Sequence, residues 1–297
     1  MATAFCPAHI TGFFKAELDK KDSKQLGSLG AGFSIQKGVK TTVTIRDKTK
    51  HDISNFTIKV NGFESGDMRV SEVVLNKFST KGKFVDIIHE IDVPVGYGFG
   101  SSAAVALSLS IALNDALECK LSKIKVAQIA HGVEIECKTG LGDVLGSYYG
   151  GFEIRDKPGA PGIGHVQKIT LNKISIIMIC FSPISTSKFI KERLPQINGL
   201  GGKMVNKLLE SKNYEHFQEM SLEFAKYVDV MTPRMQKVVN ELSKNNIKCG
   251  IALFGETIFS MIPKEKENKV LEILEKYSDG IIIKSELDDV GARVLYN

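Results

Sequence analysis

The sequence predicts an α+β fold, because strands and helices are mixed along the chain without the strict alternation of a βα repeat protein. Residues 1–90 read mostly as strands rich in β-branched and aromatic residues, interrupted by one helix. Two helices then follow a glycine-rich segment, and the second half combines strands with further helices. A length of 297 residues allows one large domain or two closely joined ones.

The individual elements follow from the spacing of apolar residues and from turn signals between them. We expect strands at 32–35, 41–45, 56–60, 84–91, 152–155, 174–181, 250–262 and 280–286. We expect helices at 68–78, 101–117, 123–136, 203–211, 214–230, 234–244 and 265–277. The helix at 101–117 is apolar on nearly every side, which predicts that it is buried.

A proline- and glycine-rich stretch at 157–162 is the best candidate for a domain boundary. It predicts an N-terminal domain at 1–160, which carries the glycine-rich loop and the candidate acids, and a C-terminal domain at 161–297. Neither part contains an internal repeat or a low-complexity segment.

Composition narrows the range of partners. The net charge is +5, with lysines spread along the chain, which suits small anionic substrates; without a basic stripe and interleaved aromatics we expect no nucleic acid. Five separated cysteines without a Cys-x-x-Cys pair predict free thiols in a cytoplasmic protein. We expect no membrane association, since there is no signal-like segment and no apolar run of membrane-spanning length.

The most informative segment is the glycine-rich loop at 94–104, Pro-Val-Gly-Tyr-Gly-Phe-Gly-Ser-Ser-Ala-Ala. Its glycines let backbone N–H groups approach an anion, and the helix that follows offers unpaired N–H groups and a positive dipole end. Neither the dinucleotide fingerprint nor the lysine-containing Walker loop fits. A tight turn with a serine N-cap is the alternative, but three glycines and two serines exceed what capping needs. The segment therefore predicts a phosphate-binding loop.

Two acids, Glu134 and Asp143, are the candidates for catalysis. Glu134 lies late on the second helix of this region, and Asp143 follows the glycine-rich turn Gly140–Gly142. A phosphoryl-transfer enzyme needs a magnesium ligand and a group that orients or deprotonates the attacking hydroxyl, and carboxylates supply both. Either residue alone would most often be a solvated surface charge.

These residues resemble the GHMP kinase family. The segment 94–104 is similar to its central phosphate motif, and 139–143 followed by Gly150–Gly151 is similar to its catalytic aspartate segment. The segments 7–14 and 134–143 together look most like the archaeal branch whose members phosphorylate pantoate. The resemblance covers nearly the whole chain.

The resemblance implies an N-terminal mixed-sheet domain with a left-handed βαβ unit and a C-terminal ferredoxin-like domain. It implies ATP-dependent conversion of pantoate to 4-phosphopantoate in coenzyme A biosynthesis, with Mg²⁺, in a homodimer. Ser102 and Glu134 would hold magnesium, and Asp143 would orient or deprotonate the acceptor hydroxyl. ATP would contact Pro94, Gly96, Gly98, Phe99, Gly100, Ser101, Ser102 and Ala103.

The sequence departs from the family pattern in three ways. The glycine-rich third motif is thin, with Gly250 and Gly255 alone in 249–257. His9 stands where mevalonate kinases carry a lysine. The spacing from Glu134 to Asp143 is short, which makes Glu136 a second candidate for the metal ligand.

Four residues are candidates for binding the acceptor: Ser28, His131, Arg155 and His9. Arg155 offers the forked donor that a carboxylate matches, and His131 lies one helical turn before Glu134. The structural alternatives are a surface arginine, a core histidine and a turn serine.

Two other functions stay open. The acceptor could be homoserine, mevalonate or a sugar, and the sequence does not separate ATP from other nucleotides. A non-catalytic nucleotide and metabolite sensor is the alternative outside catalysis, and the presence of both acids argues against it.

Overall fold

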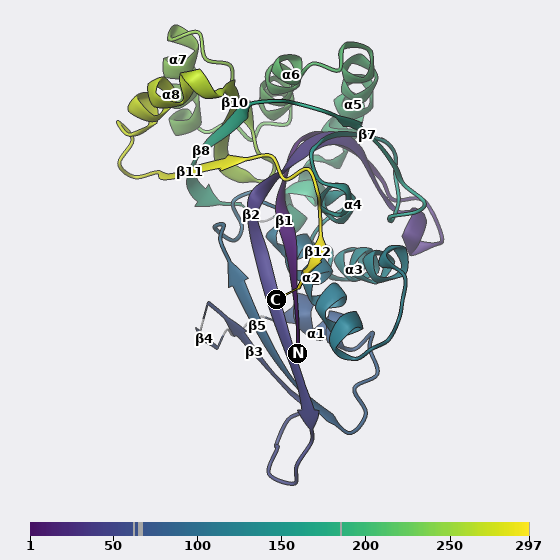
Figure 1. The fold of residues 1–297 in the computed structure, drawn as a ribbon. Helices are drawn as coiled ribbons and strands as arrows, with labels where there is room; N and C mark the ends of the chain where they lie inside the picture. Colours follow the sequence, from purple (N-terminus) through teal and green to yellow (C-terminus); the bar gives the residue numbers. More distant parts are fainter. Residues whose placement is uncertain (62, 65–67, 185, 297) are drawn as a thin grey trace.

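A long antiparallel pair of strands forms the axis of the molecule. The computed structural model describes residues 1–61, 63–64, 68–184 and 186–296. Strands β1 (Ala2–Glu17) and β2 (Gly27–Asp47) pair along almost the full length of β1 and reach from one half of the molecule into the other (Figure 1).

The first sheet is built around this pair. Its strand order is β12-β1-β2-β5-β3-β4, and β6 (Phe152–Lys157) and β7 (His165–Ile169) extend it from β2. Strands β3 (Phe56–Val60) and β5 (Lys83–Ile91) run parallel, with α1 (Arg69–Leu75) between them, which makes the expected βαβ unit; its handedness stays a prediction. The remaining strands of this sheet are β4 (Phe63–Glu64) and β12 (Arg293–Leu295).

Helices α2 (Ser101–Ala116) and α3 (Lys123–Cys137) pack together beside this sheet, and α2 contacts both β1 and β2. As its apolar sequence predicts, α2 is buried on most sides, including Leu107, Leu109 and Leu113. The close packing of α2 holds the helix, and therefore the glycine loop before it, in place relative to the sheet.

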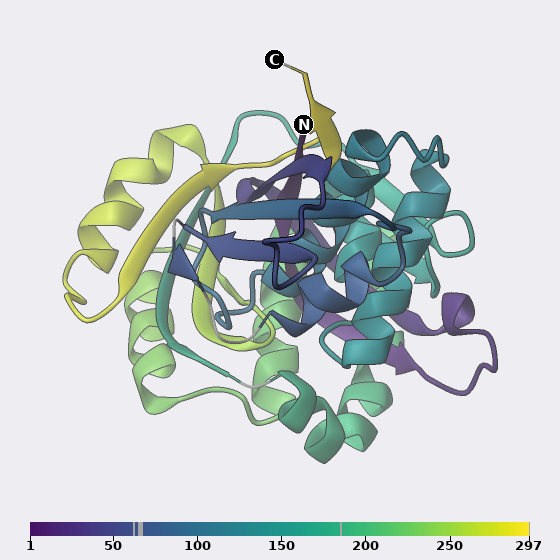
Figure 2. The same cartoon turned by 90° about the horizontal axis from the view of Figure 1, so that it is seen from below.

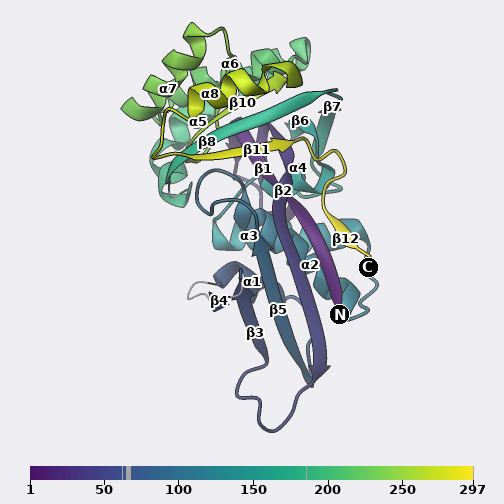
Figure 3. The ribbon, with the colours of Figure 1, turned by 60° about the vertical axis from the view of Figure 1, so that its left-hand side comes forward.

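The second sheet is antiparallel, with strand order β11-β8-β10-β9. It contains β8 (Ile174–Pro183), β9 (Gly250–Ile251), β10 (Gly255–Pro263) and β11 (Ile281–Glu286). Its helices are α5 (Thr186–Ser211), α6 (Tyr214–Tyr227), α7 (Pro233–Lys244) and α8 (Glu267–Leu274). Three helices follow β8 and one follows β10, so the order matches the β-α-β-β-α-β pattern of the expected ferredoxin-like arrangement with two additional helices in its first connection. Figure 3 shows these helices gathered at one end of the molecule.

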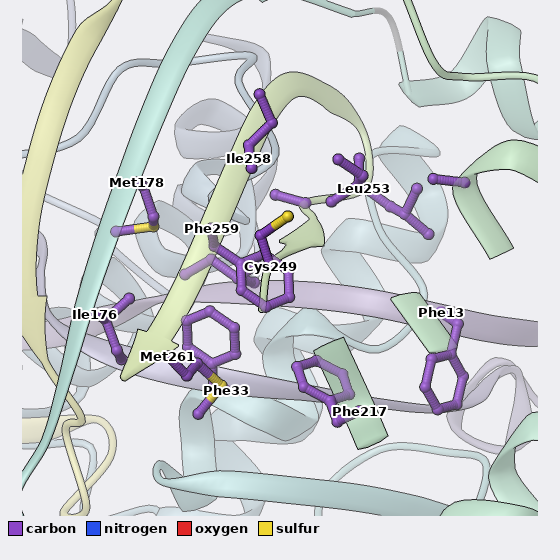
Figure 4. Close-up of a cluster of buried hydrophobic side chains, with 14 of the residues drawn as sticks. Phe13, Phe33, Ile176, Met178, Phe217, Cys249, Leu253, Ile258, Phe259 and Met261 are labelled. Carbon is purple, nitrogen blue, oxygen red and sulfur yellow. The ribbon is translucent and has the colours of Figure 1, made fainter. Parts of the chain in front are cut away.

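The two sheets share one hydrophobic core. The ring of Phe33 on β2 lies 5.0 Å from that of Phe259 on β10 and 6.1 Å from that of Phe217 on α6, and Figure 4 shows these side chains converging with Phe13. A Cβ at Gly12 would lie 2.6 Å from the Phe217 ring, so a larger residue there would displace that ring. The division at residue 160 stays a prediction, and β7 and β12, which follow it, belong to the first sheet.

Several elements differ from those expected. Helix α4 (Asp143–Tyr149) was not predicted, because seven residues containing Gly146 carry little helical pattern. The strand expected at 250–262 is two strands separated by a turn at 252–254, and the helix expected at 203–211 is the second half of the 26-residue α5. Strands β7 and β12 are short and were also missed.

The chain ends lie next to each other. Strand β12 pairs with the start of β1, with Leu295 opposite Thr3, and Figure 2 shows both termini on the same side. All five cysteines are free, as expected. Among the described residues, no helix combines the length and apolarity needed to cross a bilayer.

Candidate active site

The glycine loop has the backbone conformation that its sequence predicts. Gly96, Gly98 and Gly100 all have positive φ, at 86°, 86° and 57°, which side chains with a Cβ rarely adopt. Gly100 is the N-cap residue of α2, and no side chain caps the helix. The serine-cap alternative is therefore not realised, and the first-turn N–H groups receive no side-chain cap.

The loop is held in place by three hydrogen bonds from distant segments. The backbone N–H of His9 donates to Phe99 O (3.0 Å), the N–H of Ile184 to Gly96 O (3.0 Å), and the Thr257 hydroxyl to Tyr97 O (2.8 Å). A Cβ at Gly255 would lie 2.1 Å from Tyr97 backbone atoms. The thin third motif thus supports the phosphate loop by close packing.

Glu134 is buried beside the loop without a described cationic partner. Its carboxylate accepts hydrogen bonds from Ser102 Oγ (3.2 Å to Oε2) and from the Thr139 hydroxyl, and its exposed fraction is 2%. Burial raises the pKa of Glu134 to about 7, and the Asp143 charge adds to the rise, whereas the two hydroxyl bonds oppose it. A bound cation would supply the positive partner that this buried carboxylate lacks among the described residues.

Asp143 is the first residue of α4 rather than a loop residue. Its Oδ1 meets His9 Nδ1 at 2.9 Å and accepts from Thr11 Oγ1 at 3.2 Å. Burial acts to raise the pKa of Asp143, but the hydrogen bond and charge of His9 outweigh it, and the pKa lies below its usual range. Asp143 therefore stays ionised near neutral pH.

The two acids converge on one point. A Cβ at Gly140 would lie 2.3 Å from Glu134 Oε2 and 3.2 Å from Asp143 Oδ2, and a Cβ at Gly100 would lie 3.2 Å from Asp143 Cβ. Both carboxylates thus lie beside the glycine-rich loop. The neighbouring glycines have no side chains, which leaves room for a ligand.

A cavity of about 490 Å³ opens beside the loop, and of the two acids Asp143 lines it. It is lined by the loop from Val95 to Ser102 except Tyr97, by 138–143, and by Thr11, Phe14, Ser28, Ile184, Ile190, Leu253 and Phe254. A second cavity of about 370 Å³, more apolar in its walls, lies on the other side of the loop and shares Val95, Ser101, Ser102 and Thr139 with the first. Pro94 and Ala103 line neither cavity, and Ala103 is buried in the core.

The four candidate acceptor-binding residues occupy different places. Ser28 lines the first cavity. His131 does not; its Nε2 lies 3.0 Å from Leu26 O, and burial lowers its pKa, so its position favours the core-histidine alternative. His9 is completely buried and contacts Asp143 instead of the cavity.

Arg155 is neither a surface residue nor part of the cavity wall. It is completely buried, and its guanidinium bonds Glu153 and Thr11. Its Nε has no hydrogen-bond partner and lies 2.8 Å from the point where a Cβ at Gly142 would sit. Ser28 Oγ lies 2.4 Å from that same point, so Arg155 lies directly behind the cavity.

Other residues were misjudged or missed from sequence. Glu136, the second candidate for a metal ligand, is exposed and pairs with Lys77 at 2.7 Å. Lys138 is the only lysine or arginine among the described residues that line the first cavity, and nothing in its sequence context marked it. Among the described residues, no group of three or more His, Cys, Asp and Glu side chains is placed to hold a metal.

Comparison with known proteins agrees with this geometry. The family model for the GHMP kinase N-terminal domain matches residues 68–151, which contain the loop and both acids. A pantoate kinase from Methanocaldococcus jannaschii is 33% identical over 91% of this chain and 96% of its own, and one from Thermococcus kodakarensis is 29% identical over 91% of each.

One solved structure, titled a phosphotransferase related to the coenzyme A biosynthesis pathway, is also similar. It superposes with a TM-score of 0.88 at 28% identity, over 98% of this chain and 97% of that one. The phosphate loop, the two converging acids, the overall fold and these relatives agree, and the chain therefore belongs to the GHMP kinase family.

Proposed function

We propose that this kinase transfers the γ-phosphoryl group of ATP to pantoate and yields 4-phosphopantoate on the route to coenzyme A. The observation that carries the proposal is the convergence of Glu134 and Asp143 beside a loop whose three glycines have positive φ. The names of the curated relatives and of the similar structure support the choice of pantoate as acceptor.

The two cavities and the loop between them suit the two substrates, the nucleotide and the acceptor. The polyphosphate chain of ATP lies along the loop at 96–102, where backbone N–H groups and the start of α2 favour negative charge. The nucleoside occupies the more apolar cavity on the far side of the loop, and pantoate occupies the cavity beside Asp143.

Magnesium fits beside Ser102 and Glu134. The Glu134 carboxylate is buried between neutral hydroxyls, and a hard divalent cation prefers oxygen ligands of this kind, supplemented by phosphate oxygens and water. When bound, magnesium would offset the negative charge of the phosphates during transfer. Burial holds the Glu134 carboxylate in a fixed place toward the loop.

Asp143 acts on the acceptor hydroxyl. Because Oδ1 bonds His9 and Thr11, Oδ2 is the oxygen left to orient the primary hydroxyl of pantoate. The hydroxyl oxygen forms a bond to the γ-phosphorus as the bond from that phosphorus to the β–γ bridging oxygen breaks, and the hydroxyl proton passes to Asp143. ADP leaves with the bridging oxygen.

The pantoate carboxylate binds at the Ser28 end of the cavity. Ser28 Oγ donates to it, the unpaired Nε of buried Arg155 stabilises its charge from behind Gly142, and Lys138 supplies a further cation at the cavity wall. Replacing Ser28 by Ala removes one donor, so we expect the KM for pantoate to rise roughly tenfold, with little change in the KM for ATP.

The test is ADP release with Mg²⁺ and ATP against pantoate, homoserine, mevalonate and a sugar panel. Pantoate should give the highest kcat/KM. A higher kcat/KM with another acceptor would replace the substrate, and nucleotide binding without turnover on any acceptor would indicate the sensor function. Repeating the pantoate assay with GTP and without magnesium tests the nucleotide and the metal.

A further inference from the structure

His9 lies at the centre of a row of four charged side chains, in which Asp143 alone is partly exposed. His9 has no exposed surface, its Nδ1 lies 2.9 Å from Asp143 Oδ1, and its Nε2 lies 2.8 Å from Glu153 Oε1. A carboxylate only accepts hydrogen bonds, and a neutral imidazole has only one N–H to donate. For His9 to donate to both carboxylates at once, it must be the doubly protonated imidazolium.

The positive and negative charges of these four side chains balance. Arg155 Nη1 donates to Glu153 Oε1 at 2.5 Å, and Arg155 Nη2 donates to Thr11 Oγ1 at 3.2 Å. Two anions, Asp143 and Glu153, thus alternate with two cations, His9 and Arg155. Arg155 Nη1 also lies 3.2 Å from His9 Nε2. In the imidazolium form of His9, both nitrogens donate to the same Glu153 oxygen.

The His9 ring has no room to turn. A Cβ at Gly146 on α4 would lie 2.3 Å from His9 Nε2, and a Cβ at Gly32 on β2 would lie 2.7 Å from the same ring. Glycine at both positions is therefore required by the close approach of two elements to the imidazole. This explains why α4 carries a glycine in its middle.

The groups that face His9 come from three elements. Asp143 belongs to α4, Glu153 and Arg155 to β6, and Thr11 to β1 itself. Burial alone would lower the pKa of His9, but the hydrogen bonds to Asp143 and Glu153 outweigh it and raise the pKa. Of these groups only Asp143 and Thr11 reach the cavity wall, so Glu153 acts through its neighbours.

We propose that Glu153 is a positioning residue that keeps His9 protonated, so that His9 fixes Asp143 with Oδ2 directed at the acceptor hydroxyl. The proposal rests on the proposed kinase function for its effect on turnover. It goes beyond that function because it assigns a role to a side chain with no contact to the cavity.

The first measurement is the protonation state of His9 in the full-length protein, read from its ring ¹⁵N chemical shifts. The His9→Gln variant assigns the signal among the six histidines. At pH 7.5 both ring nitrogens of the wild type should carry protons, and one should lose its proton in Glu153→Gln. A neutral His9 in the wild type would overturn the proposal.

The second measurement is the pH profile of kcat. In Glu153→Gln we expect kcat to fall roughly tenfold to a hundredfold, as a displaced reacting group would cause, with the KM for ATP within threefold. The acid limb should move to higher pH, because a neutral His9 no longer lowers the pKa of Asp143. Wild-type kcat and profile, or a uniform loss at every pH with His9 still protonated, would refute the role.

Two further variants keep the test decisive. The double variant Glu153→Gln/Arg155→Gln removes two opposite charges together. The His9 signal can therefore be read even if the unpaired Arg155 of the single Glu153→Gln variant destabilises the fold. Asp288→Asn is the matched control, because Asp288 is also a buried carboxylate paired with an arginine, Arg293, at 2.9 Å. It should leave His9 and kcat unchanged. If the wild type does not turn over pantoate, the proposed function fails, and the ¹⁵N shifts still decide the role of Glu153.

Discussion

Two carboxylates lie beside the glycine-rich loop but have opposite electrostatic surroundings. Glu134 is bonded by hydroxyls alone and has a raised pKa, whereas Asp143 is bonded by His9 and has a lowered one. Pairs of acids whose pKa values are driven apart are typical of separate roles in a site, which agrees with the proposed roles of a cation ligand for Glu134 and a group that acts on the acceptor for Asp143. The sequence predicted both acids as candidates, but it could not predict these surroundings, because His9 lies 134 residues from Asp143 along the chain.

Asp143→Asn tests the second role. The amide keeps the shape of the side chain but removes the negative charge that, in the proposed mechanism, orients the hydroxyl and receives its proton. We expect kcat to fall roughly a hundredfold or more, with thermal stability and the KM for ATP near wild type. Near-normal turnover in a steady-state assay would remove Asp143 from the mechanism.

Glu134→Gln tests the electrostatics of the first role in the absence of ligands. The folded pKa of Glu134, about 7, lies above the ordinary value of 4.5. The contribution of protonated Glu134 to wild-type stability is therefore fully present below pH 4.5 and is lost as the pH rises through about 7. Relative to the Gln variant, the loss should approach 3 kcal/mol at most. Urea unfolding of both proteins at pH 5 and pH 8 measures it, and a pH-independent difference would contradict the assignment.

At the scale of elements, the phosphate loop was predictable because its signal is local. Glycine at 96, 98 and 100 directly indicates the backbone conformation, and the apolar run that follows predicts the buried helix. Helix α4 was not predictable, because Gly146 is there for the His9 ring and not for the helix. The break between β9 and β10 was missed for a similar reason, since the turn at 252–254 packs on β1 and on the loop.

Gly98→Ala tests the loop as a unit. Alanine at φ 86° is strained, and its Cβ would lie 3.2 Å from Ala252 O, so the loop must shift. We expect the KM for ATP to rise roughly tenfold. Gly82→Ala is the matched control, because Gly82 has φ 76° with no atom near its Cβ position. It should lose about 1 kcal/mol of stability and keep the KM of the wild type.

At the scale of the whole molecule, one core joins the two sheets. Phe217 on α6 contacts Phe13, Phe33 and Phe152 from the first sheet and Phe259 from the second. The fold class and most elements could be predicted from periodicity and from the family resemblance. This joint core could not, because nothing in the order of elements says which faces meet. The homodimer stays a prediction that sedimentation can test.

Phe217→Ala should therefore weaken both halves together. Removing a ring buried among four others costs about 3–5 kcal/mol, and we expect one cooperative thermal transition at a lower temperature. Tyr227→Ala on the same helix is the control, since Tyr227 is 53% exposed and should change stability by less than about 0.5 kcal/mol. Two separate transitions in calorimetry would show that the halves unfold independently.

The pairing of β12 with β1 also bears on how the chain could be rewired. Because Leu295 lies opposite Thr3, a short peptide could join the two ends without disturbing either strand. New ends could be opened in the exposed segment that follows β2, at 48–51, at the far end of the sheet from the glycine-rich loop. Such a circularly permuted kinase should fold and turn over its substrate at close to the native rate, because the order of synthesis would change and the packing would not.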